Sequence, residues 1–136
     1  MNINETNDKE NRSKIIFVTG PTKSGKSEFA EYLVKGNKEV TYIALSEKRP
    51  KDKKWQKKIL LHKKRRPDEW KLVETLDLIS VLNKEMGLLL IDSVGGFVLE
   101  NINKNDAEWN TKIDLLISLL KNRKSKTLIV GEQVGW

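Results

Sequence analysis

A glycine-rich loop carries the clearest chemistry in the sequence. Its eight residues match the phosphate-binding pattern G-x-x-x-x-G-K-[ST]: Gly20, Pro21, Thr22, Lys23, Ser24, Gly25, Lys26 and Ser27. Backbone N–H groups in such a loop wrap a phosphate, and the helix that follows adds a favourable partial charge. Lys26 would neutralise the β- and γ-phosphates, and Ser27 would ligate Mg²⁺. The loop predicts a site for a nucleoside triphosphate.

An acidic residue, Asp92, ends the aliphatic run GLLLID at residues 87–92. A carboxylate at the end of a buried strand commonly organises Mg²⁺ beside a phosphate loop. The alternative is an aspartate that caps a helix or forms a turn. We predict that Ser27 and Asp92 together hold the metal ion.

The single histidine of the sequence, His62, lies in a strongly basic segment. Residues 48–71 contain 12 basic and 3 acidic residues, and the whole chain has a net charge of +7. Such a segment either attracts polyanions or forms a solvated lysine-rich surface. The four residues after the histidine are all cationic: Lys63, Lys64, Arg65 and Arg66. They would disfavour the imidazolium and offset phosphate charge, so the neutral ring could attack a phosphorus atom. The alternative is an exposed surface histidine.

Hydrophobic runs indicate the strands that would position these residues. Buried strands are expected over residues 14–19, 39–45, 87–92 and 127–130, and a short edge strand over 71–75. Strands that alternate with helices predict an α/β domain with a mostly parallel sheet flanked by helices.

Helices are expected between these strands. Three helices are expected over 24–36, 76–86 and 107–122, and residues 48–64 are expected to form a loop followed by a further helix. Arg66-Pro67 should end this further helix, because proline disfavours the helical conformation in the residue before it. The apolar faces are predicted to be Phe29, Ala30 and Leu33 in the first helix, and Ile113, Leu116, Ile117 and Leu120 in the last.

Composition excludes several classes of protein. The chain of 136 residues is expected to form one domain over residues 14–136, preceded by a disordered arm over 1–13. The absence of cysteine excludes disulfides, thiolate metal sites and a cysteine nucleophile, and one histidine excludes a multi-histidine zinc site. No apolar run is long enough for a membrane span or a signal peptide, so a cytoplasmic protein is expected. The sequence ends after a strand and a glycine turn, which we interpret as a missing C-terminal part.

Four motifs in order resemble one known family. They are F-V-T-G-x-x-x-S-G-K-S at 17–27, Y-I-A-x-S at 42–46, K-I-x-x-H-x-x-x-R-P-x-x-W at 58–70 and E-x-V-G at 132–135. The sequence resembles the bifunctional adenosylcobinamide kinase/adenosylcobinamide-phosphate guanylyltransferases of cobalamin biosynthesis. The histidine pattern is the most discriminating of the four motifs.

The resemblance implies a RecA-like P-loop fold and two reactions. One phosphorylates adenosylcobinamide with GTP or ATP, and the other transfers GMP from GTP to adenosylcobinamide phosphate. His62 would be the nucleophile that carries GMP as a phosphoramidate. The implied GTP site combines the phosphate loop with Ala44, Leu45, Ser46, Lys63, Lys64, Arg65, Arg66, Glu74 and Asp92. The resemblance further implies a homo-oligomer, typically a trimer.

The sequence departs from the family pattern at several positions. Pro21 replaces a common glycine and removes one N–H donor, Lys23 replaces a common arginine, and Leu45 replaces a common hydroxyl residue. The alternatives are therefore a small-molecule P-loop kinase without a covalent intermediate, or an inactive truncated remnant. Nucleic-acid binding by the basic segment is a less favoured alternative.

Overall fold

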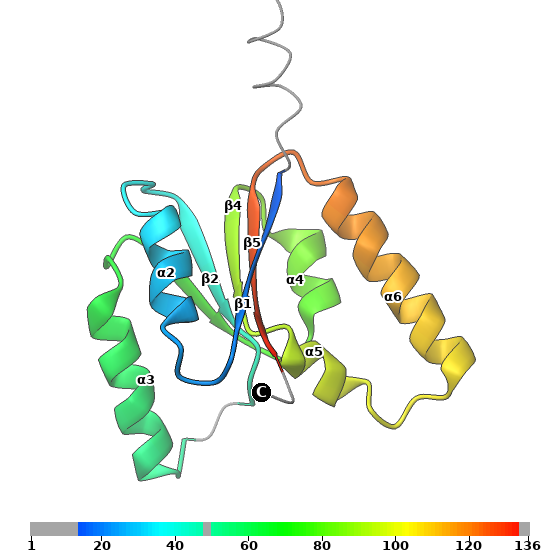
Figure 1. Cartoon of the computed structure of the whole chain (residues 1–136), viewed down its shortest axis with the longest axis horizontal. Coiled ribbons are helices and arrows are strands. Elements are labelled where there is room, and N and C mark those ends of the chain that lie inside the picture. The colour runs from blue at the N-terminus through cyan, green and yellow to red at the C-terminus, as the bar shows by residue number, and fades with distance from the viewer. Residues whose placement is uncertain (1–13, 48–49, 134–136) are drawn as a thin grey trace, which may run out of the picture.

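The computed structural model describes residues 14–47 and 50–133, and in them the chain forms one all-parallel sheet (Figure 1). Its strands are β1 (Ile15–Gly20), β2 (Val40–Ala44), β3 (Lys71–Glu74), β4 (Leu88–Asp92) and β5 (Thr127–Glu132). The strand order is β1-β5-β4-β2-β3, and every neighbouring pair is parallel. The predicted α/β class is confirmed. The arm expected over 1–13 and the end of the E-x-V-G motif lie outside the described residues.

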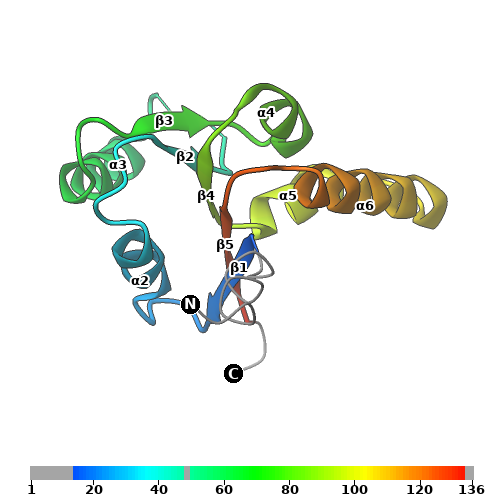
Figure 2. The ribbon, with the colours of Figure 1, turned by 90° about the horizontal axis from the view of Figure 1, so that it is seen from above.

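Helices cover both faces of the sheet. On one face lie α2 (Lys26–Leu33) and α3 (Lys53–Arg65), and on the other lie α4 (Leu78–Lys84), α5 (Gly95–Glu100) and α6 (Asp106–Lys121) (Figure 2). Side chains of Asp52, Asp77 and Asn105 accept hydrogen bonds from the first turns of α3, α4 and α6, respectively. α3 ends at Arg65, as Pro67 predicted, because Arg66 already has an extended backbone.

Two apolar clusters, one on each face, form the core. Strand residues alternate between the faces, so Ile43, Ile91 and Ile129 pack toward α4, α5 and α6. Tyr42, Leu90 and Val130 pack toward α2 together with Trp70. Trp70 is 9% exposed and donates from its indole nitrogen to the Asn37 carbonyl, so it is a packing residue of this cluster.

The predicted apolar faces of two helices are partly wrong. In α2 the buried residues are Lys26, Ala30, Glu31 and, just after the helix, Val34, whereas Phe29 and Leu33 are exposed. The helical period of 3.6 residues places positions 30 and 34 on one face and turns 29 and 33 away from it.

In α6 the predicted residues Ile113, Leu116 and Leu120 pack on the core, but Ile117 is exposed and Leu119 packs instead. The stripe of α6 is thus turned slightly from the predicted one. Short α5 was not predicted, because its Gly95-Gly96 start has low helix propensity.

Among the described residues, no helix has both the length and the apolar character needed to cross a bilayer.

Candidate active site

The carboxyl ends of the five parallel strands meet at one edge of the sheet. Their last residues are Gly20, Glu132, Asp92, Ala44 and Glu74 in spatial order from β1 to β3. The register pairs Gly20 with Glu132, and Ala44 with both Asp92 and Glu74. Open parallel sheets bind ligands at this edge. The fold therefore brings residues that are far apart in the sequence into one row.

The phosphate loop connects β1 to α2 at one end of this row. Gly25 has a φ of 82°, a left-handed conformation that glycine adopts without strain, and α2 begins at the next residue. The Lys26 ammonium is nearly buried, donates to the Pro21 carbonyl at 3.1 Å and lies 3.9 Å from the Glu132 carboxylate. The loop thus has the expected strand, turn and helix context.

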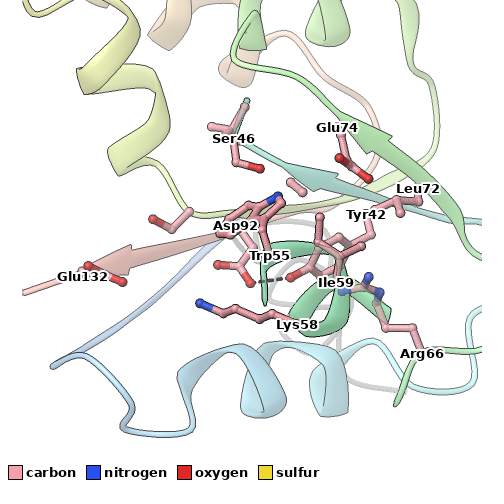
Figure 3. A pocket seen from close by; sticks show the side chains of 13 residues that line it. Tyr42, Ser46, Trp55, Lys58, Ile59, Arg66, Leu72, Glu74, Asp92 and Glu132 are labelled. Carbon is pink, nitrogen blue, oxygen red and sulfur yellow. Dashed lines mark hydrogen bonds between the residues drawn. The ribbon is translucent and has the colours of Figure 1, made fainter. Parts of the chain in front are cut away.

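A polar network joins this loop to Asp92. The Ser27 hydroxyl donates to the Asp92 carboxylate at 2.9 Å. The Tyr42 hydroxyl donates to the same oxygen, as the dashed line in Figure 3 shows. Burial and the neighbouring Asp92 charge raise the pKa of Tyr42 above its ordinary range, so the phenol stays a proton donor. The Arg66 guanidinium lies 3.9 Å from the centre of the Tyr42 ring. One chain of contacts therefore runs from the phosphate loop to the end of α3.

A cavity of about 210 Å³ opens between this edge of the sheet and α3 (Figure 3). Six predicted site residues line it: Ala44, Leu45, Ser46, Arg66, Glu74 and Asp92. Seven lining residues were not predicted as site residues: Tyr42, Trp55, Lys58, Ile59, Leu72, Ser93 and Glu132. Trp55, Lys58 and Ile59 follow one another at helical spacing, so one face of α3 forms a wall of the cavity.

Simple signals could have found several of these residues. Glu132 ends the strand TLIVGE, and acids at the ends of parallel strands gather at one edge. Trp55 and Lys58 precede His62 by seven and four residues, a spacing that places all three positions on one helix face. Ser93 had no sequence signal, since its place depends on the start of α5.

The basic residues after the histidine take different positions. Arg65 donates to both carboxylate oxygens of Glu31 and to Glu28, at distances of 2.7 to 2.8 Å. The hydrogen bond to Glu31 raises the pKa of Arg65 further above its ordinary value. Lys63 lines a smaller cavity beside Arg66, and Lys64 is exposed. Arg65 therefore fastens α3 to α2 in this structure, and the phosphate role predicted for these residues stays a prediction.

His62 lies in the last turns of α3. Its backbone is one turn beyond Lys58, which lines the cavity. The side chain of His62 is outside the described part of the structure, so its predicted role as nucleophile stays a prediction.

The pair Ser27 and Asp92 fits a Mg²⁺ ion by the chemistry of its atoms. Mg²⁺ prefers oxygen ligands and takes one or two carboxylates while keeping several waters and substrate phosphate oxygens. A hydroxyl and a carboxylate that already lie 2.9 Å apart beside a phosphate loop supply this set. No group of three or more acidic, histidine or cysteine ligands occurs within residues 14–47 and 50–133.

These features define the class as an α/β fold of the P-loop type, with the phosphate loop after β1 and an acid at the end of β4. Residues 16–136 match the model of the CobU family, cobinamide kinase / cobinamide phosphate guanyltransferase, and the chain belongs to this family. The bifunctional adenosylcobalamin biosynthesis protein CobU of Escherichia coli (strain K12) is 29% identical over 139 residues, or 89% of this chain and 76% of the relative. The family resemblance of the motifs is thereby confirmed, and the chain is a transferase of cobalamin biosynthesis.

Proposed function

We propose that the protein phosphorylates adenosylcobinamide and then transfers GMP from GTP to adenosylcobinamide phosphate through a guanylyl intermediate on His62. Membership of the cobinamide kinase / cobinamide phosphate guanyltransferase family supports this pair of reactions. The observation that carries the proposal is the junction of the phosphate loop, Asp92 and the cavity beneath α3.

The row of strand ends suggests how the nucleotide lies. The triphosphate occupies the loop between Gly20 and Ser27, where Lys26 is aimed at the loop interior. Ser27 and Asp92 hold Mg²⁺, which offsets the charge of the phosphates. The nucleoside extends along the cavity past Ala44, Leu45 and Ser46 toward Glu74, at the far end of the row.

Helical periodicity supports His62 as the nucleophile. Position 62 follows Lys58 and Ile59 by four and three residues, so it lies on the helix face that borders the cavity. In guanylylation, an imidazole nitrogen forms a bond to the α-phosphorus and the bond to pyrophosphate breaks, with its electrons leaving on the pyrophosphate. Arg66 and Lys58 line the cavity and would offset the charge of the leaving group.

The proposal includes a cytoplasmic location and the homotrimer that the family resemblance implies. The reactions themselves can be tested with the chain as it stands.

The covalent step can be tested with α-labelled GTP and Mg²⁺. The protein should acquire a label that is stable in alkali and lost in acid, as expected for a phosphoramidate. His62→Ala should abolish the label, whereas the control Lys57→Ala, an exposed position of the same helix, should keep it. A label that persists in His62→Ala would refute the nucleophile. Phosphorylation of adenosylcobinamide by a protein that never becomes labelled would instead indicate a kinase without a covalent intermediate.

A further inference from the structure

Glu132 is the acidic residue at the strand end next to the phosphate loop. It ends β5, pairs in register with Gly20 of the loop, and has one carboxylate oxygen 3.9 Å from the Lys26 ammonium. Its side chain is 52% exposed and lines the cavity (Figure 3). A carboxylate at this position lies beside the place where Lys26 would meet the terminal phosphates.

The other two acidic residues that line the cavity are placed for different tasks. Asp92 accepts hydrogen bonds from Ser27 and Tyr42. Glu74 ends β3, the outer strand on the opposite side of the sheet from β1. At about 4.8 Å per strand, β3 is about 19 Å from β1, whereas β5 is its direct neighbour. Strand spacing therefore excludes Glu74, and Asp92 already accepts hydrogen bonds from Ser27 and Tyr42. Among the described carboxylates that line the cavity, this leaves Glu132 as the one best placed to meet the γ-phosphate.

Phosphoryl transfer to an alcohol needs such a group. The attacking oxygen approaches the γ-phosphorus in line, on the side away from the leaving diphosphate. A hydroxyl is a weak nucleophile until a base within hydrogen-bond reach accepts its proton. Glu132 is partly exposed and lies 3.9 Å from the Lys26 ammonium, so a substrate hydroxyl that approaches the γ-phosphate beside Lys26 would also come within reach of this carboxylate.

We propose that Glu132 is the general base of the kinase reaction, an inference that rests on the proposed function. Its carboxylate accepts the proton of the substrate hydroxyl as the oxygen forms a bond to the γ-phosphorus. The bond from that phosphorus to the β,γ-bridging oxygen breaks, and its electrons leave with the nucleoside diphosphate. The carboxylic acid then returns the proton to water.

The same residue is not needed as a base for guanylylation, because a neutral imidazole nitrogen attacks without losing a proton from a hydroxyl. This difference separates the proposed role from two structural roles. A carboxylate that only held Lys26 in place, or only helped to bind Mg²⁺, would affect both reactions, since both use a triphosphate in the same loop.

The test compares wild type, Glu132→Gln, Glu132→Asp and the control Glu100→Gln, an exposed acid of α5 outside the site. Three quantities are measured: transfer of label from a γ-labelled triphosphate to adenosylcobinamide, self-guanylylation with α-labelled GTP, and equilibrium affinity for GTP. Glu132→Gln should lower the kinase kcat by about 100-fold or more. Guanylylation and GTP affinity should stay within about threefold of wild type. Glu132→Asp should recover part of the kinase activity, and Glu100→Gln should match wild type.

Other outcomes overturn the inference. A kinase loss below tenfold in Glu132→Gln, or an equal loss of kinase activity together with guanylylation or GTP affinity, shows that Glu132 is not the base. If wild-type protein does not phosphorylate adenosylcobinamide at all, the proposed function fails and the inference fails with it. The two failures can be told apart, because the failure of the Glu132 role is seen in a variant of a wild-type protein that is an active kinase.

Discussion

Tyr42 shows how one side chain serves both the core and the site. Its ring is 3% exposed and packs in the cluster that includes Trp70 and Leu90, whereas its hydroxyl donates to the Asp92 carboxylate. The Arg66 guanidinium lies over one face of the Tyr42 ring. Removal of the hydroxyl alone should therefore leave the packing intact while it frees one lone pair of the Asp92 carboxylate, which we propose as a Mg²⁺ ligand.

Tyr42→Phe should lower the free energy of unfolding by about 2 kcal/mol near neutral pH, the usual size for a hydrogen bond to a charged group. Burial raises the pKa of Tyr42, so the folded protein retains a proton that the unfolded chain loses above about pH 10. This contribution is complete below pH 10 and is lost as the pH rises further. Urea unfolding from pH 7 to 11 should show the advantage of wild type over Tyr42→Phe shrinking above pH 10.

Tyr32→Phe provides the control, because Tyr32 is 70% exposed. Its unfolding free energy should differ little from wild type over the same range. A difference between wild type and Tyr42→Phe that stays constant to pH 11 would contradict the proton retention by the buried phenol.

At the scale of the element, ion pairs at the C-terminal end of α3 attach this helix to α2. Arg65, in its last turn, makes the ion pairs with Glu28 and Glu31 of α2. Because α2 begins at the phosphate loop, these bonds tie the helix that carries His62 to the loop that would hold the triphosphate. The position of α3 should therefore be sensitive to this one residue.

Arg65→Gln should destabilise the protein by about 1–2 kcal/mol, a modest amount because the guanidinium is partly exposed. Guanylylation should fall more strongly, by about tenfold, since the loss frees α3 to move away from the loop. Lys57→Gln removes the same charge from an exposed position of α3 and should change neither quantity. Thermal melts and the rate of labelling by α-labelled GTP measure the two effects. Equal behaviour of the two variants would exclude the attachment role.

A second feature of element packing is the close contact between α5 and Leu45, the residue that follows β2. A Cβ added at Gly96 would lie 2.2 Å from the Leu45 carbonyl oxygen, whereas one added at Gly95 would meet its nearest atom, the Ser93 hydroxyl, at 3.5 Å. Gly96→Ala should thus cost about 1–3 kcal/mol and shift Leu45, which lines the cavity. We expect an increased KM for GTP as well. Gly95→Ala should be nearly neutral in a thermal melt, and a similar loss in both variants would contradict this.

The sequence predicted all five strands that the described residues form, and the phosphate loop, because these depend on local patterns. β4 and β5 are continuous aliphatic runs, and Gly25 must adopt a positive φ wherever the loop occurs. The buried face of α2 could not be predicted from its apolar residues. Phe29 and Leu33 are apolar but exposed, because the short connection to β1 sets the rotation of the helix about its axis. The cavity wall from Trp55 to Ile59 depends on how α3 lies across the sheet, and local sequence does not encode that placement.

At the scale of the whole molecule, the two edges of the sheet have different tasks. The carboxyl ends of the strands hold the candidate site, and the amino ends are joined by Arg123. Its guanidinium donates to the Thr127 hydroxyl at 3.0 Å, to the Glu85 carbonyl at 2.7 Å and to the Gly87 carbonyl. Glu85 and Gly87 lie just before β4 and Thr127 begins β5, so one side chain joins the turn before β4 to the start of β5.

Arg123→Gln should therefore separate stability from activity. Burial lowers the pKa of Arg123, and its loss leaves two carbonyls and the fully buried Thr127 hydroxyl with fewer partners. We expect the free energy of unfolding to fall by about 2–4 kcal/mol. The KM for GTP and the rate of self-guanylylation should stay within about twofold of wild type at a temperature where both proteins are folded, because the strand length separates Arg123 from the site. Lys121→Gln, an exposed position two residues earlier, controls for the change of charge. Urea unfolding measures the loss of stability, and labelling kinetics measure the activity. If Arg123→Gln lost GTP affinity as well as stability, the two edges of the sheet would be coupled.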